Sequence, residues 1–272
     1  MSLQSWNYAA VVLHIGMLIY VFTIPNKNVT LYKFKYEVDT SPSSDLDYAL
    51  TTEEGKKTSI KPFVLLFFGI TAIAHLLYAL NFWGYEAAIE NFGWNPLRWF
   101  EYSLTASLMI YVIAIVAGAK EESTALTAAL ITPGLMLQGL TVEREIHQNA
   151  LAAWASFQAP KPDIDPVLVW ANFLPAWFFF GLKWFIIFHA YNVLKKQLKE
   201  EGKTIDPKIT QLVFIQFACF SVFGIIQTCQ IYGWWTKTRG HWSQGRFIMY
   251  EKAYIVMSFL AKALLGFSVA RL

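Results

Sequence analysis

Two ionisable residues stand inside long apolar stretches of this chain: Lys262, in Met257-Ser-Phe-Leu-Ala-Lys-Ala-Leu-Leu-Gly266, and Glu101. A charge at membrane depth costs about 2.5–3.5 kcal/mol on insertion scales, so each of these residues requires a partner or a chemical modification. A lysine and a carboxylate in such surroundings suit two kinds of chemistry. One is a buried ion pair, and the other is an imine on the lysine that stays protonated beside the carboxylate.

Further polar residues recur at helical spacing around both positions. The first stripe follows i, i+3, i+7 and consists of Arg98, Glu101 and Thr105. The second follows i, i+3, i+7, i+11 and consists of Glu251, Tyr254, Ser258 and Lys262. Because residues at these spacings share one face of a helix, the two stripes predict an internal polar site between two apolar helices.

The elements that position these stripes are predicted from hydropathy. Of the 272 residues, 56% are hydrophobic and 15% are charged, which is more apolar than one soluble core can bury. Seven runs are long enough to cross a lipid bilayer as helices. The predicted spans are Asn7–Ile24, Pro62–Trp83, Pro96–Ala119, Ser123–Val142, Pro166–Leu194, Pro207–Trp235 and Phe247–Ala270. We therefore expect an all-α membrane protein, with residues 1–272 forming a single seven-helix transmembrane domain.

One connection is long, from Asn26 to Lys61, and its polar and apolar residues alternate before Pro42. This pattern favours a β-hairpin over the mouth of the bundle, and a disordered loop is the alternative. Cys219 and Cys229 lie ten residues apart in one predicted helix, so they cannot pair with each other. A net charge of +3 is too small to indicate a nucleic-acid partner.

The segments Arg98-Trp-Phe-Glu-Tyr-Ser-Leu-Thr-Ala-Ser107 and Glu251-Lys-Ala-Tyr-Ile-Val-Met-Ser-Phe-Leu-Ala-Lys262 resemble the third-helix and seventh-helix signatures of heliorhodopsins. The resemblance extends over all seven spans and the long first loop. It implies that Lys262 binds all-trans-retinal as a Schiff base, that Glu101 is its counterion, and that Ser258 forms a hydrogen bond nearby. It also implies that His14 and His75 accept the released proton.

For the remaining candidate residues, packing in the protein core is an alternative to a role at the chromophore. A histidine on an apolar helix is often a core residue, and this alternative stays open for His14 and His75. Four aromatic or soft residues are candidates to line the polyene or simply to pack between helices: Met109, Trp177, Phe220 and Phe223. Lys183 is a second intramembrane lysine without a family role, and it is expected to snorkel or to line a water cavity.

The resemblance favours a photoreceptor with a slow photocycle rather than an enzyme or a classical ion pump. Proton pumps of the ordinary microbial type keep a second carboxylate eleven residues after the counterion, where this chain has Val112. One alternative is passive, light-activated proton transport through Glu101, His14 and His75. A second alternative is a receptor or transporter that binds no retinal, in which Glu101 and Lys262 form an ordinary ion pair.

The charge count and the family resemblance predict opposite orientations of the chain in the membrane. Thirteen Lys and Arg residues flank the spans on the side opposite the N-terminus and five on the N-terminal side, so the positive-inside rule places the N-terminus outside. Heliorhodopsins have a cytoplasmic N-terminus, and they form homodimers. We follow the resemblance, because the long first loop carries six acidic residues beside its six basic ones. The expected location is the plasma membrane.

Overall fold

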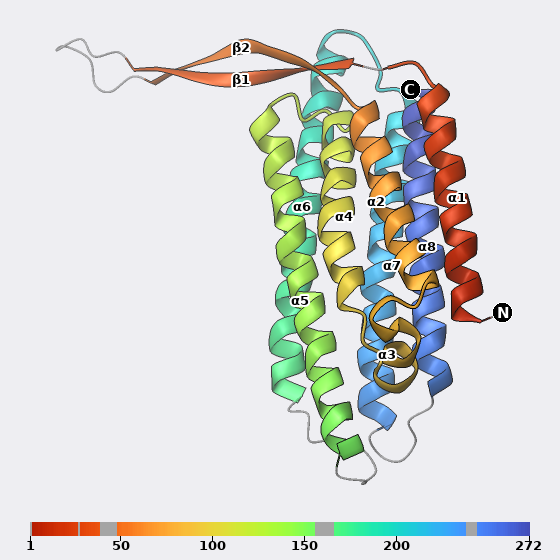
Figure 1. Cartoon of the computed structure of the whole chain (residues 1–272). Coiled ribbons are helices and arrows are strands. Elements are labelled where there is room, and N and C mark those ends of the chain that lie inside the picture. Colours follow the sequence, from red (N-terminus) through yellow and green to blue (C-terminus); the bar gives the residue numbers. More distant parts are fainter. Residues whose placement is uncertain (1, 27, 39–47, 156–165, 238–243) are drawn as a thin grey trace.

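The computed structural model describes residues 2–26, 28–38, 48–155, 166–237 and 244–272, and Figure 1 shows a bundle of long helices. Seven helices in the described part of the chain are long and apolar enough to cross a membrane. They are α1 (Leu3–Thr23), α2 (Lys61–Ala79), α4 (Pro96–Val116), α5 (Glu122–Ala155), α6 (Pro166–Glu200), α7 (Pro207–Lys237) and α8 (Gln244–Arg271). The predicted seven-helix bundle is therefore confirmed.

Helix α4 forms the centre of the bundle. Within its membrane-spanning window 72% of the residues are buried, and it packs against α2 and α5 and also contacts α6 and α7. The start of α4 is encoded locally, because the side chain of Asn95 accepts a hydrogen bond from the backbone N–H of Arg98 and Pro96 occupies the first turn. This central helix carries the first polar stripe.

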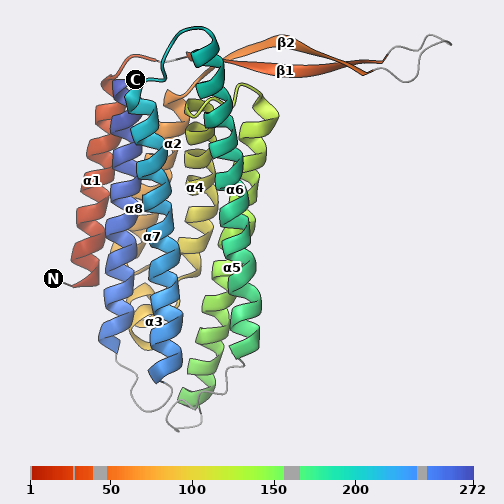
Figure 2. The same ribbon diagram turned by 180° about the vertical axis from the view of Figure 1, so that it is seen from behind.

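The long first connection forms the predicted β-hairpin. Strand β1 (Asn28–Val38) pairs antiparallel with β2 (Tyr48–Ser59), with a register irregularity between Thr30 and Tyr32. The expectation that it covers the mouth of the bundle is only partly right, because the hairpin begins at one end of the bundle and then projects sideways beyond it (Figures 1 and 2). Residues 39–47 lie outside the described part.

The segment after α2 differs from the prediction. The second span was expected to reach Trp83, but α2 ends at Ala79 and is followed by a short 3-10 helix, η1 (Phe82–Gly84), and by α3 (Tyr85–Phe92). Asn81 and Trp83 have positive φ angles of 53° and 56°, a conformation that ends a regular helix. This turn places α3 against α8.

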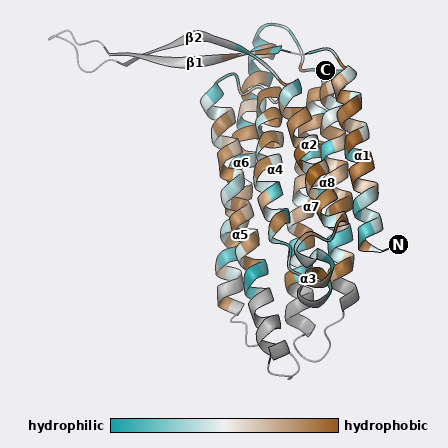
Figure 3. Ribbon diagram, in the orientation of Figure 1, coloured by the Kyte–Doolittle hydropathy of each residue, from teal (hydrophilic) through white to brown (hydrophobic). Residues whose placement is uncertain are grey.

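The outer surface of the bundle is apolar. Several large apolar side chains on different helices are strongly exposed: Val12, Phe22, Leu130, Phe178 and Phe185. Hydrophobic residues cover the long helices over much of their length in Figure 3. Since such a surface is unstable in water and suited to lipid, the chain is a multi-pass integral membrane protein.

Candidate functional site

The centre of the site is a buried pair between α4 and α8. Lys262 Nζ lies 3.3 Å from Glu101 Oε1, and both side chains are about 95% buried, with 4% and 5% of their surface exposed. Lys262 Nζ also donates a hydrogen bond of 2.8 Å to Ser258 Oγ, one turn earlier on α8. The structure thus brings together the lysine, carboxylate and serine that the two polar stripes single out.

The Glu101 carboxylate is held in place by two threonine hydroxyls as well as by the lysine. Thr105 Oγ1 donates to Glu101 Oε1 at 2.9 Å, as the helical spacing predicts. Thr71 Oγ1, on α2, donates to the same oxygen at 2.5 Å. Thr71 was not predicted from the sequence, where its only signal is that it stands one turn before His75 on a largely apolar helix.

A second ionic cluster forms around Arg98 at the start of α4. The Arg98 guanidinium pairs with both Glu143 on α5 and Glu251 on α8, and all three side chains are buried. Asn95 Nδ2 donates to Glu251 Oε1 at 2.8 Å. The guanidinium carbon lies 4.1 Å from the centre of the Tyr254 ring. Arg98, Glu251 and Tyr254 therefore form a site next to Glu101 and Lys262 rather than contacting the lysine directly.

Glu143 was also missed, because the fourth span was predicted to end at Val142, one residue earlier. In the structure α5 continues to Ala155, which turns Glu143 into a buried helical residue.

Hydrogen bonds continue from this cluster to the two histidines. Tyr85 Oη donates to Glu251 Oε1 at 2.9 Å, and Asn7 Nδ2 donates to Tyr85 Oη at 3.3 Å. Asn7 Oδ1 is 2.8 Å from His75 Nδ1, and the rings of His75 and His14 stack with centroids 5.3 Å apart. Burial, followed by the charge of Glu251, raises the pKa of Tyr85 well above its usual range, so this phenol remains a hydrogen-bond donor.

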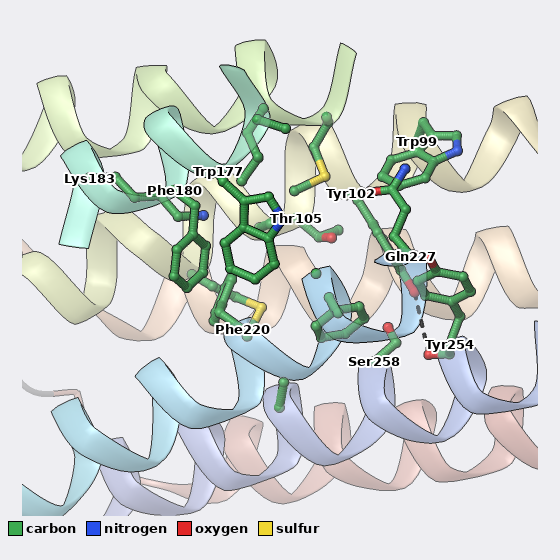
Figure 4. A pocket seen from close by; sticks show the side chains of 18 of the residues that line it. Trp99, Tyr102, Thr105, Trp177, Phe180, Lys183, Phe220, Gln227, Tyr254 and Ser258 are labelled. Carbon is green, nitrogen blue, oxygen red and sulfur yellow. Dashed lines mark hydrogen bonds between the residues drawn. The ribbon is translucent and has the colours of Figure 1, made fainter. Parts of the chain in front are cut away.

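The lysine also lines a cavity whose walls are mainly apolar and aromatic side chains. Figure 4 shows its aromatic walls, contributed by α4, α6, α7 and α8. All four predicted pocket residues line it: Met109, Trp177, Phe220 and Phe223. An amine at the wall of an aromatic cavity fits an apolar polyene aldehyde. The side chains around Lys262 therefore have the chemistry that retinal requires.

Lys183 on α6 lines the same cavity and is 0% exposed. The expectation that it snorkels is wrong, since its ammonium end does not reach the surface. It points into the cavity beside Phe180 (Figure 4).

A seven-helix membrane protein whose buried lysine pairs with a carboxylate and faces an aromatic cavity has the architecture of a retinal-binding rhodopsin. A family model described as Heliorhodopsin matches residues 3–271, nearly the whole chain. The chain therefore belongs to the heliorhodopsin family, which are light-sensing rhodopsins with a retinal chromophore. No curated protein matches the chain.

Proposed function

We propose that this protein is a photoreceptor in which Lys262 carries all-trans-retinal as a protonated Schiff base, with Glu101 as the counterion. The observation that carries this proposal is the position of Lys262 Nζ, at the wall of the aromatic cavity and 3.3 Å from Glu101 Oε1. Bound retinal supplies the absorption of visible light and the change of shape that follows it.

The protein's own residues set the charge and geometry at the lysine. Lys262 condenses with the aldehyde carbon with loss of water, and the nitrogen then holds a proton beside the carboxylate. Two unit charges at 3.3 Å attract by about 5 kcal/mol at an effective dielectric constant of about 20. Thr71 and Thr105 hold the carboxylate oxygen on the lysine side, which keeps this attraction directed at Nζ.

The sequence of α4, the helix that carries Glu101, favours a slow photocycle over proton pumping. Val112 stands where the ordinary pumps have a proton-donating carboxylate, and it is a fully buried apolar residue here. A nitrogen that has lost its proton to Glu101 would regain one slowly without an internal donor. A slow return to the ground state suits signalling, in which the active form must persist long enough to be detected.

A second candidate function is passive proton transport under light, and one observation favours it. Hydrogen bonds run without a break from His75 through Asn7 and Tyr85 to Glu251, next to Arg98. Chains of buried ionisable and hydrogen-bonding groups are what a proton path requires. Light-evoked current in a voltage-clamped cell, reversing with the proton gradient, would favour transport. Absence of current would favour signalling.

One spectrum tests the proposed function. Purified protein mixed with all-trans-retinal is expected to develop a visible absorption band, and Lys262→Ala is expected to remain colourless. Lys262→Arg is a matched control, because it keeps a positive charge beside Glu101 but has no primary amine to form an imine. A wild-type protein that stays colourless would support a receptor or transporter without retinal, in which Lys262 and Glu101 form a structural ion pair.

Orientation and assembly are further parts of the proposal. We expect a cytoplasmic N-terminus in the plasma membrane, which places the hairpin of β1 and β2 outside the cell, and a homodimer. Protease added to intact cells should cut within residues 26–61. Cross-linking in membranes should yield a species of twice the monomer mass. If the loop were protected from protease, the N-terminus would lie outside the cell instead. If cross-linking gave only the monomer mass, the homodimer would be excluded.

A further inference from the structure

Lys183 occupies a position that the proposed function does not explain. Its side chain is completely buried on α6 and lines the same cavity as Lys262. Its Nζ has no hydrogen-bond partner in the part of the chain that the structure describes. The nearest favourable contacts are two aromatic rings, those of Phe180 at 5.4 Å and Phe220 at 4.8 Å from Nζ to the ring centre.

A buried amine with only ring faces around it is costly. Its N–H groups lose their bonds to water on burial, and an unmade hydrogen bond in an apolar site is more expensive than a made one is favourable. Ring faces attract a cation but do not accept three N–H bonds. An acceptor is therefore missing on the cavity side, which is where Lys183 points (Figure 4).

The two amines lie toward different ends of this cavity. Lys183 stands with Phe180 and Phe220 toward one end of the view in Figure 4, whereas Ser258 and Tyr254 lie toward the other. Lys262 Nζ is at the Ser258 end, because it is 2.8 Å from Ser258 Oγ. A retinal joined through its aldehyde carbon to Lys262 would extend its ring toward Lys183.

We propose that this cavity takes a retinal whose ring carries an oxygen, as a keto or hydroxyl group, and that Lys183 donates a hydrogen bond to that oxygen. The inference rests on the proposed function, since it requires the aldehyde end to be at Lys262. An oxygen on the ring supplies the acceptor that the buried amine lacks, while the rest of the molecule remains apolar against the aromatic walls.

Competition between chromophores tests this assignment. Purified protein free of chromophore is given equal amounts of all-trans-retinal and either all-trans-4-oxoretinal or all-trans-3-hydroxyretinal. The bound aldehydes are then released with hydroxylamine and their oximes are quantified by chromatography. Wild type is expected to retain at least one of the oxygenated aldehydes over plain retinal by about five- to tenfold, the size of one net hydrogen bond.

Two variants identify the source of the preference. Lys183→Met keeps the length of the side chain but removes the donor, so the preference should disappear or reverse. Gly181→Ala lies on the same helix as Lys183, its added methyl group meets no atom within 4 Å and the amine stays in place, so it should keep the preference. If Lys183→Met does not fold, the wild-type ratio decides alone, and equal retention of all three aldehydes overturns the inference.

The outcomes separate this inference from the function on which it rests. Pigment with every aldehyde but no preference in wild type, or the same preference in Lys183→Met, would overturn only the role of Lys183. No pigment with any aldehyde in wild type would overturn the proposed function and the inference together.

Discussion

Replacing Arg98 by methionine probes the ionic cluster at the start of α4. The change leaves the carboxylates of Glu143 and Glu251 buried without their common cation, since 1% and 3% of these side chains is exposed. Removing one partner of a buried ion pair costs about 3–5 kcal/mol, because the remaining charge is left uncompensated. We therefore expect Arg98→Met to lower the free energy of unfolding by about that amount.

A combined variant makes this test sharper. If the loss comes from uncompensated charge, then adding Glu143→Gln and Glu251→Gln to Arg98→Met should restore a large part of it, although the variant carries three substitutions. Arg144→Met is the matched control, because Arg144 is exposed on the same helix as Glu143 and its replacement should change stability by about 0.5 kcal/mol or less.

Denaturant titration in mixed micelles, followed by helical circular dichroism, measures these free energies. The reasoning would be refuted if Arg98→Met were as stable as wild type. It would also be refuted if the triple variant were less stable than Arg98→Met, because the losses would then simply add.

Three further predictions concern the pigment. Glu101→Gln should shift the visible band to longer wavelength, because loss of the carboxylate destabilises the protonated ground state; an unchanged spectrum would exclude Glu101 as counterion. Lys183→Ala should keep the visible colour with all-trans-retinal, and a colourless variant would move the chromophore to that lysine. Gly224→Ala should change the absorption maximum, since a Cβ there would lie 2.8 Å from the Trp177 ring at the cavity wall. Gly181→Ala meets nothing within 4 Å on the same helix as Trp177, and an equal shift there would contradict the steric argument.

The sequence predicted features that depend on local pattern. Apolar runs gave the seven spans, and alternation gave the hairpin of β1 and β2, because both patterns arise within one element. Helical spacing placed Thr105 beside Glu101 and Ser258 beside Lys262, and the structure shows both hydrogen bonds. In these cases the partners lie one turn apart on a single helix.

Features that depend on contacts between distant segments were not predicted. Thr71, Asn7 and Tyr85 are ordinary residues in sequence, and they join the site only because α2, α1 and α3 pack beside α4 and α8. Glu143 was missed for a different reason: the predicted span ended at Val142, whereas α5 ends at Ala155. Hydropathy marks where a span becomes polar, whereas α5 continues as a helix beyond that point.

The central claim is the attachment of retinal to Lys262, and peptide mass spectrometry tests it most directly. Pigment formed with all-trans-retinal is reduced with borohydride, which makes the bond to lysine stable, and is then digested and sequenced. We expect the added retinyl mass on Lys262 and none on Lys183. Retinyl mass on Lys183, or a visible pigment in which Lys262 is unmodified, would contradict the account.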